Sequence, residues 1–129
     1  MRKALLATAM LAGIAAPAPV QAEYHWRKLG QRDLNVESDA RQVIEVGTDR
    51  RFNTLRLCVS RQPILIREVA VRFREGGART YALGWTLQNL RCTGDIVFSG
   101  DGRELADVTI SYNPAGLSRR GARLQLDAR

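Results

Sequence analysis

Few residues in this chain have the chemistry that a catalytic site needs. The 129 residues include one histidine, His25, and two cysteines, Cys58 and Cys92. A hydrolytic triad needs a nucleophile, a base and a group that orients the base, and His25 lies close to an N-terminal end, where a base is hard to hold in place. The 13 acidic residues are scattered among arginines, so no pair of carboxylates stands out as a glycosidase pair. We therefore predict no enzyme, no catalytic residue, no metal site and no cofactor.

One stretch that could bind a metal is IVFSGDGRELADVTISY, in which Asp101, Glu104 and Asp107 surround two glycines. A calcium loop of the EF-hand type would need oxygen ligands at alternating positions and a bidentate glutamate at the twelfth. This stretch lacks that pattern. Asp101-Gly102 is instead the dipeptide that a two-residue hairpin turn prefers, so the acidic residues are interpreted as turn and surface residues.

This turn predicts a hairpin between the residues on its two sides. A tight turn pairs Phe98 with Leu105, but the apolar residues beyond that pair then fall out of phase. One extra residue, a bulge near Ala106 or Asp107, would place Ile96 opposite Val108.

The N-terminus has the pattern of a secretory signal peptide. Arg2 and Lys3 precede an apolar run from Ala4 to about Ala16, and small residues lead to a predicted cleavage after Ala22. The apolar run is short for a transmembrane helix, which needs roughly 20 residues, so we expect a soluble protein, periplasmic or secreted. Removing residues 1–22 takes away two of the 20 basic residues and none of the 13 acidic ones, which leaves a charge of 18 − 13 = +5.

Export bears directly on the cysteines and on the basic charge. An even cysteine count in an oxidising compartment favours a disulfide between Cys58 and Cys92, with reactive thiols or a metal pair as alternatives. In FNTLRLCVS the apolar set is Leu55, Leu57 and Val59, which puts Cys58 on the outer face. The connection that carries Cys92 is therefore inferred to fold back over that face.

The basic charge bears on the partner. A pI near 10.4 would suit nucleic acid, but the predicted export argues against that partner and favours anionic envelope material.

Strand-like alternation dominates the exported part, and no helical period persists in it. The expected fold is all-β, a small antiparallel β-sandwich of about seven strands. The expected strands are 26–35, 43–47, 52–60, 64–74, 79–85, 95–100 and 106–112.

The clearest hairpin is VAVRFREGGARTYALGW. With Gly76, Gly77 and Ala78 in the loop, Phe73 would face Tyr81 and Val69 would face Trp85, which keeps one face apolar. The same register puts Glu75 opposite Arg79. It also leaves Arg72 and Arg74 opposite small residues on the outer face, where they form a candidate anion-binding face or an ordinary solvated surface.

The remaining residues, 113–129, are expected to form a basic, flexible tail, because strand alternation weakens and arginines gather there. Leu124 to Leu126 could add an edge strand. The predicted organisation is therefore a signal peptide at 1–22, a β-sandwich domain at 23–112 and this tail.

Three segments carry a resemblance to a known family: HWRKLGQRDL, FNTLRLCV with ILIREVAVRF, and RCTGDIVFSGDGRELADVTISY. Over most of residues 25–112 the chain resembles the uncharacterised bacterial exported proteins of the YaaI type, a domain-of-unknown-function family, and the two cysteines correspond. The resemblance implies an exported β-sandwich without established catalytic or binding residues. It does not extend to the tail.

These observations give two main functional hypotheses, besides a third, a stress-related structural protein without a ligand. The first is a non-enzymatic exported β-sandwich of unknown function that binds an anionic envelope component or another envelope protein, through the Arg72/Arg74 face or an exposed sheet edge. The alternative is a small hydrolase that acts on envelope glycans or lipids.

Overall fold

A computed structural model describes residues 25–129, so the predicted signal peptide and its cleavage site lie outside the described residues. Within this range every regular element is a β-strand, and no helix is long and apolar enough to span a membrane. The strands are β2 (Arg27–Leu34), β3 (Arg41–Glu45), β4 (Arg51–Phe52), β5 (Thr54–Ser60), β6 (Ile64–Phe73), β7 (Ala78–Leu87), β8 (Arg91–Cys92), β9 (Ile96–Val97), β10 (Arg103–Asn113) and β11 (Ala122–Ala128).

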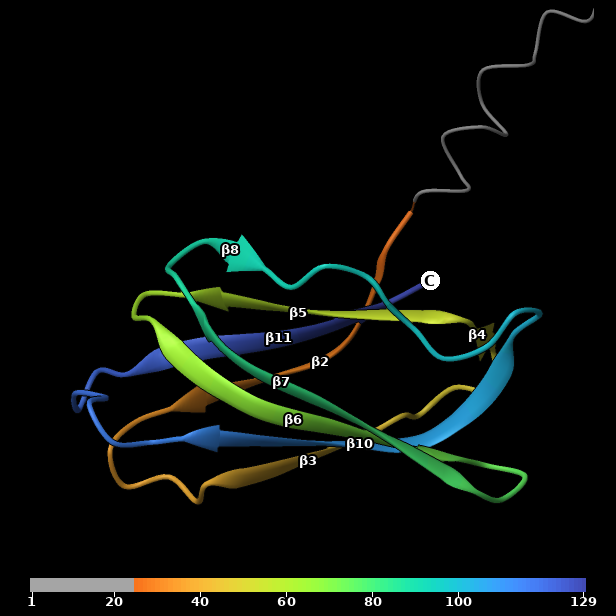
Figure 1. Cartoon of the computed structure of the whole chain (residues 1–129), viewed down its shortest axis with the longest axis horizontal. Coiled ribbons are helices and arrows are strands. Elements are labelled where there is room, and N and C mark those ends of the chain that lie inside the picture. Colours follow the sequence, from red (N-terminus) through yellow and green to blue (C-terminus); the bar gives the residue numbers. More distant parts are fainter. Residues whose placement is uncertain (1–24) are drawn as a thin grey trace, which may run out of the picture.

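The strands form two antiparallel sheets that pack face to face, which confirms the predicted β-sandwich (Figure 1). One sheet has the order β3-β10-β6-β7, with β4 paired to one end of β10. The other has the order β2-β11-β5-β8, with β9 also paired to β5. The core between them consists of the alternating apolar residues of both sheets, led by Tyr112, Phe73, Phe98, Leu55, Leu57 and Leu126.

The predicted tail is wrong. Residues 122–128 form β11, the strand between β2 and β5 in the second sheet, and Leu124 and Leu126 are fully buried. Four apolar residues alternate in this segment, Ala122, Leu124, Leu126 and Ala128, and all four face the core. The arginines that gather around this segment, Arg119, Arg120, Arg123 and Arg129, concealed that alternation. The strand is central, whereas the sequence suggested an edge strand at most.

The hairpin of β6 and β7 forms, but its register differs from the prediction. Phe73 N–H donates to Gly77 O at 3.0 Å, and Val69 lies opposite Tyr81 instead of Trp85. The turn is therefore tighter than predicted, with positive φ at Gly76 and Gly77. The shift is an even number of residues and leaves every side chain on its predicted face, so alternation alone could not detect it.

The predicted hairpin around Asp101-Gly102 is also wrong. β9 pairs with β5 in one sheet and β10 pairs with β6 and β3 in the other, so this turn links the two sheets. Ile96 lies opposite Leu55 instead of Val108. The predicted bulge near Ala106 does occur, between Leu105 and Asp107, but it adjusts the pairing of β10 with β6.

A disulfide joins Cys58 to Cys92, as predicted, with 3.9 Å between the two Cα atoms. Cys58 of β5 and Cys92 of β8 lie directly opposite each other in the antiparallel ladder. The connection that carries Cys92 therefore extends the sheet as an edge strand, and the inference that it folds back over the outer face is wrong. The bridge fixes this short strand, which has one ladder partner.

Candidate anion-binding site

Arg72 and Arg74, the predicted anion-binding face, are both engaged within the fold. The guanidinium of Arg72 donates to the Asp107 carboxylate, with Nε at 3.0 Å from Oδ2. This ion pair raises the pKa of Arg72, chiefly through the hydrogen bond that Arg72 donates to Asp107. Arg74 Nη2 donates to the carbonyl oxygens of Val46 and Thr48, both at 3.2 Å. Arg72 finds its partner on β10 and Arg74 finds its partners in the connection between β3 and β4, and the sequence alone did not reveal either.

Two acidic residues of the stretch around the Asp101-Gly102 turn also lie beside arginines. Asp107 binds Arg72, and Glu104 lies 3.8 Å from Arg74. Glu75 was expected opposite Arg79, but Arg103 donates to it at 3.1 Å. Over residues 25–129 there is no group of three or more histidine, cysteine or acidic side chains that could hold a metal ion.

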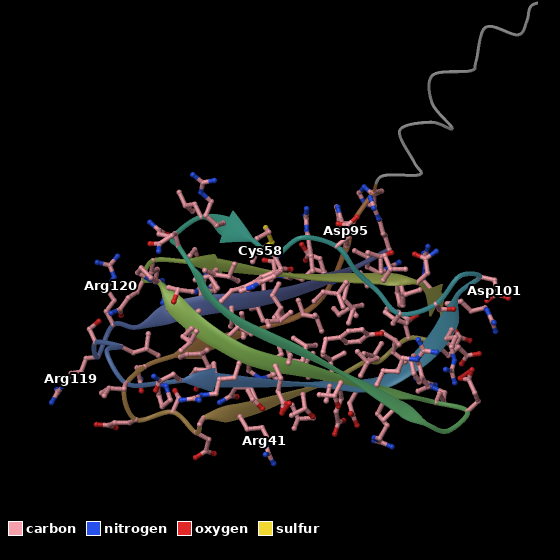
Figure 2. The ribbon with its side chains drawn as sticks, in the orientation of Figure 1. Arg41, Cys58, Asp95, Asp101, Arg119 and Arg120 are labelled. Carbon is pink, nitrogen blue, oxygen red and sulfur yellow. A yellow bond between two sulfur atoms is a disulfide. The ribbon has the colours of Figure 1, made fainter. Side chains whose placement is uncertain are left out.

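A different group of residues forms a concave polar site at one end of the sandwich. Three connections meet there: the β5–β6 turn, the β7–β8 turn and the loop between β10 and β11. They enclose a pocket of about 390 Å³. The lining residues, which we call the arginine pocket, are Arg61, Gln62, Asn89, Ser118, Arg120 and Gly121. Figure 2 shows Arg120 and Arg119 at this end of the molecule.

Hydrogen bonds from Gln62 hold the pocket in shape. Its amide Nε2 donates to Gly116 O at 2.8 Å, and its Oε1 accepts from Ser118 N–H at 3.0 Å. The Ser118 hydroxyl also donates to Gln62, at 3.2 Å, and accepts from Gly121 N–H at 3.1 Å. One glutamine thus ties the loop before β11 to the turn before β6.

The backbone of the pocket contains an unusual conformation. Arg61 has φ of +79°, which non-glycine residues rarely adopt. Its N–H donates to Asn89 Oδ1 at 2.6 Å, which links the β5–β6 turn to the β7–β8 turn. Leu90, next to Asn89, has φ of +63°. Strained backbone of this kind is concentrated at functional sites in proteins.

Positive charge exceeds negative charge at the pocket. Asp33 binds Arg123 at 2.9 Å and lies 3.5 Å from Arg61. The hydrogen bond from Arg123 lowers the pKa of Asp33, so this carboxylate is ionised at neutral pH. Arg120 makes no hydrogen bond or ion pair within residues 25–129. Its guanidinium is therefore a free cation on a preformed concave surface.

The sequence did not predict the arginine pocket. Arg120 was assigned to the flexible tail, and the residues of the pocket come from segments that are far apart in the chain. The available signal was the gathering of Arg119, Arg120 and Arg123 around the start of β11.

Comparison with known proteins gives one result. A family model matches residues 4–127, and its description is "Domain of unknown function (DUF2541)". No curated protein and no solved structure matches the chain.

Proposed function

The chain belongs to the DUF2541 family, and we propose from the geometry of its site that it is an exported, non-enzymatic binding protein for an anionic envelope component. The ligand group is an oxyanion, a phosphate or carboxylate, that enters the arginine pocket. The observation that carries the proposal is the free guanidinium of Arg120 in a concave site that hydrogen bonds already hold in shape.

Export is part of the proposal. The signal-peptide pattern of residues 1–22 supports it, and so does the Cys58–Cys92 disulfide, because such bridges persist in oxidising compartments. The resemblance to exported proteins of the YaaI type agrees with the same location. Phosphate and acidic sugars are the anions that an envelope offers in quantity.

The donors of the pocket suit an oxyanion. A guanidinium presents two parallel N–H groups to a phosphate or carboxylate, which makes strong charge-assisted hydrogen bonds. Arg120 supplies one such group, and Arg61, which also lines the pocket, shares its charge with Asp33. Ser118 Oγ already donates to Gln62, so it is not placed as a free nucleophile, and binding fits this site better than catalysis.

Binding is tested by calorimetric titration of the purified, oxidised protein with inorganic phosphate, glucuronate and lipopolysaccharide, each at low and high salt. Loss of a charged hydrogen bond costs about 1.5–3 kcal/mol, so Arg120→Gln should weaken binding about ten- to hundredfold. Arg41→Gln is the matched control, because Arg41 is an exposed arginine of β3 away from the pocket (Figure 2).

The comparison of ligands identifies the group that is recognised. If the protein binds both phosphate and glucuronate, the pocket recognises oxyanions in general. If it binds lipopolysaccharide alone, the pocket recognises a larger part of the lipopolysaccharide headgroup. Equal losses in Arg120→Gln and Arg41→Gln would contradict a defined pocket. The hydrolase alternative is tested with the same preparation, and it requires turnover of an envelope glycan or lipid that a single carboxylate substitution abolishes in a folded protein.

A further inference from the structure

The two long sides of the sandwich differ. On one side β2 packs closely against β3: a Cβ on Gly30 would lie 2.7 Å from Ile44 Cγ2, and Arg32 Nη2 donates to Val43 O at 2.9 Å. On the other side, as far as residues 25–129 are concerned, β7 pairs only with β6, and β8 and β9 pair only with β5. One side of the sandwich is therefore closed and the other is open.

A hollow of about 420 Å³ runs along the open side. Tyr81, Leu83 and Trp85 of β7 form one wall, and Ile96 and Val97 of β9 form the other. Tyr81 and Leu83 are partly buried against the core, whereas Trp85 is 51% exposed and Val97 is 60% exposed. We call this hollow the open-side groove.

Along the same groove, no strand of the described part of the chain pairs with the free edge of β7. Phe73 N–H donates to Gly77 O, so the residues of β7 that bond β6 alternate from Gly77 through Arg79 to Tyr81. The N–H and C=O groups of Ala78, Thr80 and Ala82 point away from β6. A register irregularity at Gly84, with φ of +65°, ends this free run.

A free strand edge beside an apolar groove is suited to bind a peptide segment in the extended conformation. A strand added to an exposed edge bonds the free backbone groups and places alternate side chains in the pockets beneath it. Next to β7, those side chains would fall beside Leu83 and Tyr81. The next position on the same side is that of Arg79, whose ladder partner Val71 faces the core.

Arg79 adds a requirement for charge. It is exposed, and it has no hydrogen-bond or ion-pair partner within residues 25–129. An antiparallel strand passes Leu83, then Tyr81, then Arg79, so its inward side chains would be apolar, apolar and acidic at alternate positions. We propose that an envelope protein donates such a strand to β7.

The proposal is tested with capped seven-residue peptides and the full, oxidised protein. The probe is acetyl-Thr-Val-Thr-Val-Thr-Asp-Thr-amide, and the control peptide has Lys in place of Asp. Amide NMR shifts should appear in β7 and β9 with the Asp peptide. An exposed ion pair contributes up to about 1 kcal/mol, so the Asp peptide should bind about fivefold more tightly than the Lys peptide.

Two variants make the test specific. Arg79→Glu should reverse the peptide preference, while Arg41→Glu, the same change on β3, should leave it unaltered. Thr80→Pro removes an outward N–H that β6 does not use, so it should abolish peptide binding while the protein stays folded.

Three outcomes would overturn the proposal. The first is that the peptide shifts amide signals outside β7 and β9. The second is that the native protein and every variant bind the Asp and Lys peptides equally well. The third is that the protein forms a concentration-dependent dimer, which Thr80→Pro dissociates. The dimer would assign this edge to a second copy of the chain.

Discussion

Gly121 is the residue at which the arginine pocket depends most strictly on side-chain size. It has φ of +69°, and a Cβ there would lie 1.6 Å from the carbonyl oxygen of Leu34. Gly116, in the same loop, has φ of +90°, but a Cβ there would meet no atom within 4 Å. We expect Gly121→Ala to lower the free energy of unfolding by about 3 kcal/mol or more, and Gly116→Ala by about 1 kcal/mol, the cost of strain alone. Urea unfolding of the two variants measures the difference, and equal losses would show that the contact with Leu34 relaxes freely.

Asp33, which lies beside Arg61 of the arginine pocket, should make the stability of the fold depend on pH. Because the hydrogen bond from Arg123 lowers its pKa in the folded state, ionised Asp33 stabilises the fold above its unfolded pKa, near 3.9. That stabilisation is lost as pH falls through the lower, folded value. The melting temperature of the native protein should therefore fall further between pH 6 and pH 3 than that of Asp33→Asn. Parallel melting curves would contradict this role of Asp33.

At the level of single residues, local chemistry predicted some features and missed others. Cys58 and Cys92 were paired correctly because the predicted export and an even cysteine count leave few alternatives. The roles of Arg72 and Arg74 were not predictable, because Asp107 and the carbonyls of the β3–β4 segment reach them only in the folded sheet. The anion-binding role of these two arginines stays a prediction.

β11 is the element whose importance was most underestimated. If residues 113–129 formed a flexible tail, substitutions there would leave stability unchanged. Because Leu124 is fully buried between the sheets, Leu124→Ala should lower the free energy of unfolding by about 2–5 kcal/mol. Arg119→Ala, an exposed change in the same predicted tail, should stay within about 0.5 kcal/mol. Chemical denaturation of both variants tests this, and a stable Leu124→Ala protein would contradict a central β11.

The strands of 26–112 were largely predictable because the longer ones, such as β5, β6 and β10, alternate apolar and polar residues over most of their length. The pairing of these strands was less predictable. The β6–β7 register moved by an even number of residues, which preserves the faces, and β9 and β10 joined different sheets although a favourable turn dipeptide connects them. Alternation determines which side of a strand is buried, whereas the choice of neighbour depends on contacts between distant segments.

The whole molecule depends on such distant contacts, and the disulfide reinforces one of them. Cys58 and Cys92 are 34 residues apart, so the bridge should stabilise the fold by about 3–4 kcal/mol through the loss of chain entropy in the unfolded state. The double variant Cys58→Ala/Cys92→Ala should remain folded and lose about that amount in urea unfolding, because β8 is a short edge strand. No loss, or no cooperative transition at all, would contradict this account.

At the same scale, the fold class and the disulfide were predictable from the sequence, and the binding sites were not. The arginine pocket combines residues of three connections between 61 and 121, and the open-side groove combines β7 with β9. Each site forms only when the two sheets pack and bring these distant segments together.

The most direct test of the proposed function is an amide NMR titration of the ¹⁵N-labelled, oxidised protein with inorganic phosphate at low salt. We predict saturable shifts confined to the arginine pocket, at Asn89, Ser118, Arg120 and Gly121, and their loss in Arg120→Gln. Weak, unsaturable shifts spread over exposed arginines such as Arg41 would show that the basic surface attracts anions without a defined site, and would contradict the proposal.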